Sequence, residues 1–213
     1  MDTANDLRIR LAEKGLKELE KLLQNVKVQK RKELVSKVKE MSALLQTLKY
    51  SYVDAKTLKE FDEFRKLVSE AKSIRDAIKK AERDFNTISA DYWLEYLESL
   101  PELMDRGEID SPCLAIKFFV GKITSRSEIL KGKLWLCLID CGFRLEVVTN
   151  SNEFVVGKKA IVAYLPPKKF GDVISRGMFV SLVDDDLKEG EADVETIEKY
   201  CKNAKAEILS LLQ

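Results

Sequence analysis

The stretch that decides the fold is Val156-Gly157-Lys158-Lys159-Ala160-Ile161-Val162-Ala163-Tyr164-Leu165-Pro166-Pro167-Lys168-Lys169, closed by Ser175-Arg176-Gly177-Met178-Phe179-Val180. A short β-rich run meets a double proline, two lysines and then a Ser-Arg-Gly-Met turn. Nothing in it has the pattern of a nucleophile or a metal ligand. The proline-stiffened loop and its lysines indicate a surface that binds an anion.

This region closely resembles the second half of the tRNA-binding OB-fold domain family. Members of that family are appended to methionyl- and some phenylalanyl-tRNA synthetases, occur free-standing in bacteria, and form part of eukaryotic synthetase cofactors. They carry a V-G-K-K run, an N-L-x-P-x-K element and then S-x-G-M. The matching region runs from about Ile116 to Val183. The resemblance implies an OB barrel that binds tRNA, and it does not extend to a catalytic domain.

The chain departs from the family pattern in three loops. The family's H-P-x-A-D-K-L segment corresponds to residues 125–135, where only Lys133-Leu134 and the following aromatic residue remain. Its V-S-G-I is replaced by Val148-Thr149-Asn150-Ser151, and its Asn-Leu by Tyr164-Leu165. The fold inference therefore rests on more residues than the assignment of tRNA as the ligand.

The apolar pattern predicts five short strands, over residues 114–123, 133–140, 143–149, 158–164 and 177–183. Five short strands within this span are the size of an OB barrel. We therefore expect a five-stranded OB-fold β-barrel over residues 113–183. Residues 105–112, rich in acidic residues with Gly and Pro, are the expected linker, and residues 184–213 an acidic turn followed by a C-terminal helix.

The first 100 residues contain one glycine, Gly15, and no proline, which predicts helix. Apolar residues recur in alternating steps of three and four, the coiled-coil pattern. We expect one helix from about Asp6 to Lys49, a turn, and a second long helix, forming an antiparallel coiled-coil hairpin. With a short third helix from about Ser89 to Leu103, this domain spans residues 1–104. The predicted fold class is α+β with more than one domain.

Charge is segregated along the chain although the net charge is only +1. Residues 113–183 hold eleven Lys and Arg against five Asp and Glu, a net charge of +6, whereas residues 184–213 carry a net charge of −5. The basic excess therefore lies on the segment that resembles a nucleic-acid binder. The helical segment adds two basic runs, 27–32 and 79–80, for which a solvated helix face is the simpler interpretation.

Several function classes find no support in the sequence. It has no phosphate-binding glycine motif, no Gly-x-Ser-x-Gly and no histidine, so we predict that it is not an enzyme and uses no cofactor. Its four cysteines lack Cys-x-x-Cys spacing, which predicts buried free thiols rather than a metal site. No apolar run is long enough to span a membrane and the N-terminus is polar, so we expect a cytoplasmic protein without membrane association.

The candidate RNA-binding residues are the basic side chains around the predicted strands together with the Ser-Arg-Gly-Met turn. Gly177 is expected to supply a backbone geometry that a Cβ would forbid. The resemblance implies tRNA contact for Ser175 and Met178; from the residues alone, Met178 could equally lie in the core and Ser175 cap the turn. The candidates are Lys122, Arg126, Lys131, Lys133, Lys158, Lys159, Lys168, Lys169, Ser175, Arg176 and Met178.

Two functions fit these observations. The first is a non-catalytic tRNA-binding protein, an auxiliary factor that delivers or retains tRNA for an aminoacyl-tRNA synthetase; its helical hairpin would either form a homodimer or dock it on the synthetase. The second is an assembly adaptor, in which the coiled coil and a diverged OB domain mediate oligomerisation without RNA binding.

Overall fold

A computed structural model describes residues 1–212 of the chain. Two compact units divide it. The helical unit comprises Met1–Asp110, with the end of the chain from Leu211, and the strand unit comprises Ser111–Ser210. With helices and an antiparallel sheet, the chain belongs to the α+β class, as predicted. Within the described residues, no helix is both long and apolar enough to cross a membrane.

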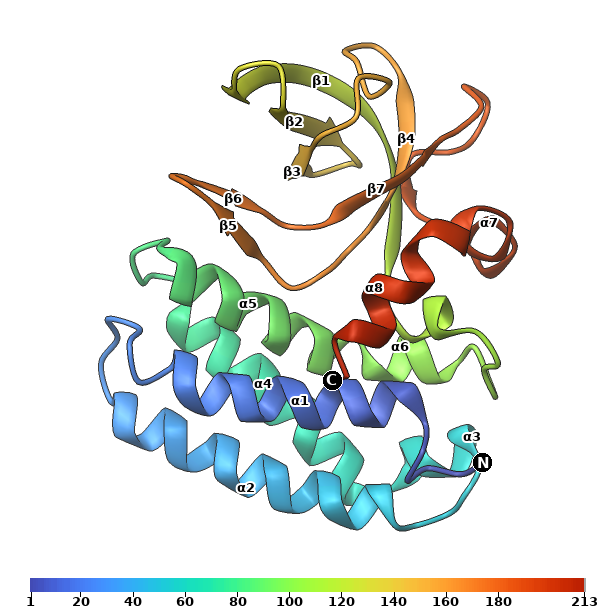
Figure 1. Cartoon of the computed structure of the whole chain (residues 1–213). Helices are drawn as coiled ribbons and strands as arrows, with labels where there is room; N and C mark the ends of the chain where they lie inside the picture. Colours follow the sequence, from blue (N-terminus) through green and yellow to red (C-terminus); the bar gives the residue numbers. More distant parts are fainter. Residues whose placement is uncertain (213) are drawn as a thin grey trace. The chain divides into compact units, whose positions relative to one another are not determined.

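The helical unit is built from amphipathic helices (Figure 1). Most of the apolar residues that recur in the sequence are buried; Leu19, Met41 and Ile74, for example, are fully shielded from solvent. Asp residues cap α1, α3 and α5, accepting hydrogen bonds from first-turn amides. The helices are α1 Leu7–Leu22, α2 Arg31–Lys49, α3 Ala55–Glu60, α4 Asp62–Ile78, α5 Phe85–Glu98 and α6 Leu100–Met104.

The predicted single helix from Asp6 to Lys49 is wrong, because α1 ends at Leu22 and α2 begins at Arg31. The run 27–33 has no apolar seam, and Lys30 adopts the left-handed conformation with φ 56°, so the chain turns there. The predicted third helix is shifted as well, since α5 begins at Phe85 and α6 is separate.

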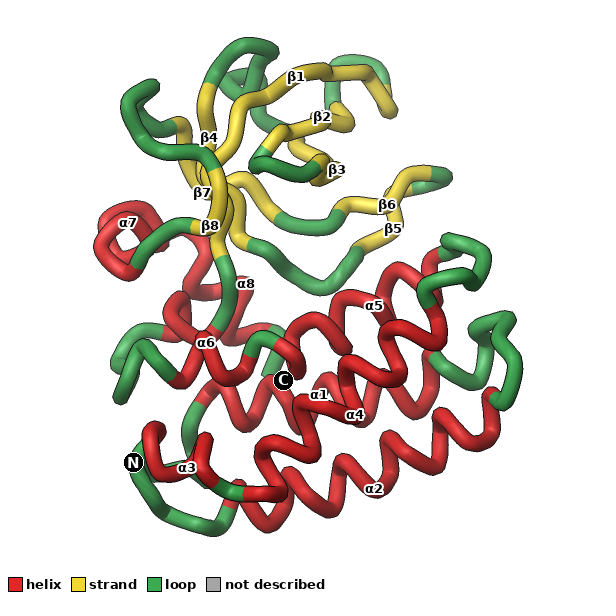
Figure 2. The backbone as a smooth tube through the Cα atoms, turned by 180° about the vertical axis from the view of Figure 1, so that it is seen from behind, coloured by secondary structure: helices red, strands yellow, loops and turns green. Residues whose placement is uncertain are grey.

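The predicted two-helix hairpin is also wrong. Four of the described helices form a bundle in which α1 packs on α2 and α5, and α4 packs on the same two helices (Figures 1 and 2). This arrangement gives every apolar stripe two neighbours, which a hairpin cannot do. Gly15 allows a close approach of α1 and α5, because a Cβ there would lie 2.6 Å from the Trp93 ring.

The strand unit contains an antiparallel sheet with the strand order β3-β2-β1-β4-β7; β8 also pairs with β1, and β5 and β6 form a separate hairpin. Its apolar face includes Ile123, Ile139 and Val147, all fully buried. The elements are β1 Phe118–Leu130, β2 Leu134–Asp140, β3 Arg144–Thr149, β4 Lys159–Ala163, β5 Lys168–Phe170, β6 Val173–Ser175, β7 Met178–Leu182, β8 Gly190–Glu191, α7 Val194–Tyr200 and α8 Lys205–Ser210, with short 3-10 turns at Pro112–Ala115 and Cys201–Ala204.

The predicted strands 133–140, 143–149, 158–164 and 177–183 correspond to β2, β3, β4 and β7. The first predicted strand, 114–123, is misplaced: a 3-10 turn occupies its start, and β1 runs on from Phe118 to Leu130. Pro112 fixes the first residue of that turn, and Leu114 N–H bonds to the Ser111 carbonyl, so the chain curls before it extends. The β5–β6 hairpin and β8 were not predicted from the sequence.

Candidate nucleic-acid interface

The β1–β2 hairpin presents three of the predicted basic residues. The guanidinium carbon of Arg126, on β1, lies 4.3 Å from the centroid of the Trp135 ring on β2. Arg126 also donates to the Ser151 carbonyl at 3.3 Å, while its Nε is buried without a hydrogen-bond partner in the described part of the chain. Lys131 and Lys133 are exposed in the turn between the strands. The hairpin thus combines two solvated cations with an arginine stacked on an aromatic ring.

A second group of lysines lies where β1 and β4 pair. Lys122 faces Lys159 across the ladder, and Lys158 immediately precedes β4. Lys122 and Lys158 are exposed. The Lys159 ammonium instead donates to the carbonyls of Asp185 and Leu187, both at 2.7 Å, and its side chain is only 13% exposed. Lys159 therefore fastens the acidic loop after β7 to the sheet, and its contact with RNA stays a prediction.

Lys168 and Lys169 lie on β5, after the stiff Pro166-Pro167 pair. Both are exposed, and they differ in their partners. The Lys168 ammonium forms an ion pair with Glu207 of α8, whereas Lys169 forms no ion pair with any residue that the structure describes. An anion approaching β5 would therefore meet Lys169 directly and would compete with the Glu207 carboxylate for Lys168.

Ser175 is buried and fully engaged within the fold. Its hydroxyl accepts a hydrogen bond from Val148 N and donates one to the Gly177 carbonyl, both at 3.0 Å. A Cβ at Gly177 would lie 2.7 Å from the Ala163 carbonyl oxygen, so close packing rather than an unusual φ requires glycine there. The direct contact of Ser175 with RNA stays a prediction, since it would first require these bonds to break.

Arg176 and Met178 flank that glycine. The Arg176 side chain donates to the Tyr164 hydroxyl at 2.9 Å, and its backbone N–H bonds to the Glu146 carbonyl at 2.8 Å. Its Nε has no partner among residues 1–212 although it is buried. Met178 is half-buried and lines a cavity of about 160 Å³ with Leu165, Lys168, Glu207 and neighbouring residues. The two side chains therefore lie partly within the fold.

The structure brings some of these candidates together. In both views the ends of the β1–β2 and β5–β6 hairpins project from the same side of the strand unit (Figures 1 and 2). Lys131 and Lys133 lie in the turn of the first hairpin, and Lys168 and Lys169 lie on β5, the first strand of the second. Lys122 and Lys158 form a separate pair at the β1–β4 ladder.

Two partners of the basic residues were missed in the sequence. Trp135 was noted only as part of a motif, yet the register pairs Arg126 with Cys137, two residues along the strand from Trp135, which places the pair on one face. A correct hairpin register would have revealed it. Glu207 gave no signal, because its pairing with Lys168 joins a strand to a helix distant in sequence.

The cysteines confirm the prediction of buried free thiols. Burial raises the pKa of Cys141 to about 12, with Asp140 adding to the shift, and burial likewise raises the pKa of Cys113 to about 12. Such thiols are protonated and unreactive at neutral pH. No cluster of three possible metal ligands occurs within residues 1–212.

The helical unit matches the model of a known family. Residues 1–107 match the model of a family described as an alpha helical domain. The chain belongs to this alpha helical domain family. No curated protein is significantly similar to this family member. Among solved structures it is similar to one described as the crystal structure of a MetRS related protein from Pyrococcus horikoshii, with 23% identity, a TM-score of 0.34, and coverage of 37% of this chain and 90% of that chain.

Proposed function

We propose that the chain is a non-catalytic protein that binds structured RNA through its strand unit. The sequence motifs of residues 156–180 imply tRNA as the class of ligand. In this proposal the protein is a cytoplasmic auxiliary factor that delivers or retains tRNA for an aminoacyl-tRNA synthetase. Sheet-based RNA binders use lysines to neutralise phosphates and exposed aromatic or arginine planes to stack on bases.

The observation that carries the proposal is the shared side of the two hairpins. Lys131, Lys133 and Lys169 are exposed there, without an ion-pair partner in the described chain, and Lys168 is held only by an ion pair with a partly exposed carboxylate. Exposed cations on these hairpins contribute little to folding, because surface charges have small effects on stability. A polyanionic ligand accounts for their position on one side.

An OB barrel is the fold that we propose for the strand unit, with β1, β2, β3, β4 and β7 as its five strands. The described ladder ends at β3 and β7. Two hydrogen bonds support closure, because Val148 N donates to the Ser175 hydroxyl and Arg176 N donates to the Glu146 carbonyl. Both join β3 to the segment that leads into β7, where a barrel of this kind closes.

A titration of unfractionated tRNA, followed by fluorescence anisotropy, tests the proposal. The Lys168→Ala/Lys169→Ala variant is compared with wild type at about 50 and about 200 mM salt. We expect binding roughly tenfold weaker at the lower salt, and a salt slope smaller by about 1–2, because up to two phosphate contacts are lost. The control, Lys188→Ala/Lys202→Ala, removes two exposed lysines from the acidic segment and should bind as wild type.

Equal binding by both variants and wild type would count against the proposal. Absence of any tRNA binding at low salt would turn attention to the second candidate, an assembly adaptor. A groove of about 670 Å³ on the helical unit favours that candidate; its wall includes Val68 and Pro101 beside Lys59, Arg65 and Lys72. Light scattering tests this second candidate: the adaptor proposal requires a homodimer that Val68→Glu dissociates, and a monomer at every concentration refutes it.

A further inference from the structure

Two loops distant in sequence meet at one end of the helix bundle. The first, residues 23–30, joins α1 to α2, and the second, residues 79–84, joins α4 to α5. Both views show them at the same end (Figures 1 and 2), and the Lys27 ammonium lies 2.9 Å from a Glu82 carboxylate oxygen. The bundle thus joins the two basic runs that the sequence shows separately.

This basic end carries seven cationic side chains, and its acidic groups are largely occupied. Glu82 pairs with Lys27, Glu33 lies 3.6 Å from the Lys30 ammonium, and Asp84 caps α5 by accepting from Thr87 N at 2.8 Å. The other five cations are exposed and form no ion pair within residues 1–212. The seven are Lys27, Lys30, Arg31, Lys32, Lys79, Lys80 and Arg83.

Local stability does not explain the cations that begin α2. The start of a helix carries partial positive charge, so a cation in the first turn is unfavourable by roughly 0.3–1 kcal/mol. Lys30, Arg31 and Lys32 nevertheless occupy this start, and Lys30 supplies no side-chain cap. Lys79 and Lys80, by contrast, follow the C-terminus of α4, where cations are favourable.

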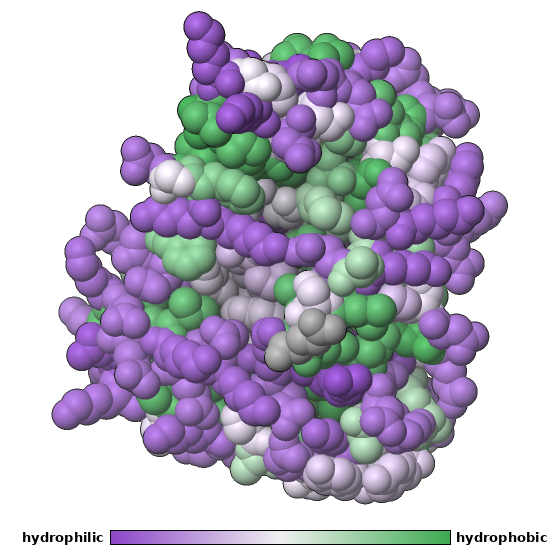
Figure 3. Space-filling view, viewed as in Figure 1, coloured by the Kyte–Doolittle hydropathy of each residue, from purple (hydrophilic) through white to green (hydrophobic). Residues whose placement is uncertain are grey.

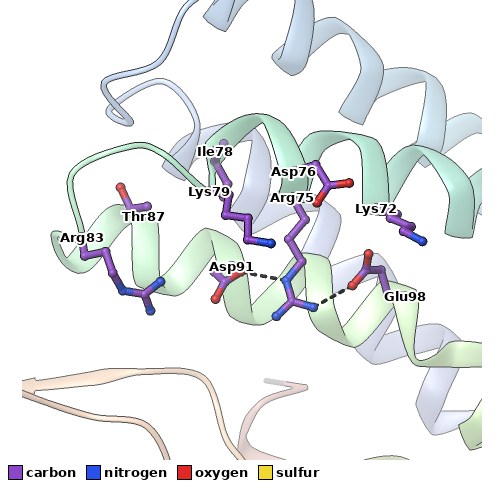
Figure 4. Close-up of a pocket in the computed structure, with 9 residues that line it drawn as sticks. All are labelled: Lys72, Arg75, Asp76, Ile78, Lys79, Arg83, Thr87, Asp91 and Glu98. Carbon is purple, nitrogen blue, oxygen red and sulfur yellow. Dashed lines mark hydrogen bonds and ion pairs between the residues drawn. The ribbon is translucent and has the colours of Figure 1, made fainter.

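A pocket of about 420 Å³ on the helical unit continues the basic end, since Lys79 and Arg83 belong to both. Lys72 extends its cationic wall (Figure 4). Arg75 pairs with two of the pocket's carboxylates, on Asp91 and Glu98, with N–O distances of 2.8 and 2.7 Å, and also with Glu95 at 3.1 Å; Asp76 is a further carboxylate on the wall. The Thr87 hydroxyl, which also lines it, is buried without a hydrogen-bond partner in the described chain. The four cations of the pocket therefore face three carboxylates, so the cations available to an anion are the exposed ones of the two loops rather than those inside the pocket.

We infer that this basic end is a second RNA-binding surface, which contacts backbone phosphates independently of the strand unit. A partner with repeated negative charges fits exposed cations spread over two loops and the start of α2. A protein partner fits less well, because its binding energy usually depends on apolar anchors, and among the described residues of these loops no large apolar side chain is exposed. Hydrophilic residues also dominate this end in Figure 3. Only the choice of RNA as the polyanion rests on the proposed function.

The test uses the full chain with Lys32→Ala/Lys80→Ala/Arg83→Ala, which removes one cation from α2 and two from the second loop. The probe is unfractionated tRNA, titrated across salt concentrations. We expect binding roughly tenfold weaker at low salt and a salt slope smaller by about 2–3. The matched control, Lys39→Ala/Lys56→Ala/Lys66→Ala, removes three exposed, unpaired lysines elsewhere on the helical unit and should change binding less than twofold.

The outcomes separate this inference from the proposed function. Loss of binding in the basic-end variant but not in Lys168→Ala/Lys169→Ala supports the inference and counts against RNA binding by the strand unit. The reverse result overturns the inference and leaves the proposed function intact. Equal loss in the matched control would mean that only total charge matters, which also overturns it. Poly-glutamate that displaces tRNA at equal charge concentration would refute RNA as the specific polyanion.

Discussion

Replacing Gly177 with alanine tests why the motif that decides the fold contains a glycine. Gly177 is not among the glycines with positive φ, so its backbone conformation alone does not require glycine. A Cβ there would instead lie 2.7 Å from the Ala163 carbonyl oxygen and 2.8 Å from a Val162 methyl carbon. Both atoms belong to β4, the neighbour of β7 in the sheet. Gly177→Ala must therefore push β7 away from β4.

The magnitude follows from two opposing effects. Inserting a methyl group into a packed region costs about 1–3 kcal/mol. Alanine also restricts the unfolded chain more than glycine, which offsets about 0.4–1 kcal/mol. We therefore expect the strand unit to lose about 1–2 kcal/mol of unfolding free energy. For a unit of roughly 100 residues, this loss lowers the melting temperature by about 5–15 °C.

The two tryptophans allow the strand unit to be observed alone. Trp93 lies in the helical unit and Trp135 in the strand unit, so a Trp93→Phe background leaves Trp135 as the reporter of urea unfolding. Gly171 is the contrast, because it has φ +61° and no atom within 4 Å of an added Cβ. Asparagine should be tolerated better than alanine at Gly171 and worse than alanine at Gly177. An unchanged midpoint for Gly177→Ala, or the opposite order of Asn and Ala, would refute the close-packing argument.

Three further predictions concern other contacts. Gly15→Ala should destabilise the helical unit by about 1–3 kcal/mol, measured by far-UV circular dichroism, because the added methyl group would meet the Trp93 ring at 2.6 Å. Glu207→Gln should tighten tRNA binding about two- to fivefold at low salt and leave it unchanged at high salt, because it releases Lys168 from a partly exposed ion pair. The protonated Cys141 thiol should leave the unfolding free energy of the strand unit independent of pH below about pH 9. Between about pH 9 and the raised pKa of about 12, that free energy should fall by roughly 1.4 kcal/mol per pH unit, because the buried thiol resists ionisation. Denaturation midpoints of Cys141→Ala, measured over the same pH range, should fall less steeply.

Strand positions were more predictable from the sequence than the helix arrangement, for a physical reason. β2, β3, β4 and β7 each fall within an apolar or alternating run, and such a run specifies a strand almost by itself. The steps of three and four in the first 100 residues specify an apolar face but not its partner. A two-helix hairpin and a four-helix bundle use the same pattern, and only tertiary packing, such as Trp93 against Gly15, distinguishes them.

The candidate site was predictable as a set of residues but not as a set of roles. Exposed lysines such as Lys169 and half-buried ones such as Lys159 look alike in a sequence. The role of Lys159 depends on two backbone carbonyls about 26 residues away, at Asp185 and Leu187, which no local pattern reveals. The β5–β6 hairpin was missed because its three-residue strands are too short to show periodicity.

The basic end of the helical unit shows where a local rule and the observed sequence disagree. A stable helix start favours a Ser, Asp or Asn cap, as Asp6, Asp54 and Asp84 illustrate at three other helices. The start of α2 has Lys30-Arg31-Lys32 instead. Sequences usually agree with local preferences, and exceptions concentrate at functional positions. A ligand that brings negative charge to this end would stabilise the start of α2, so ligand binding and the stability of that helix would be coupled. The ion-paired cations on the sides of the bundle would show no such coupling.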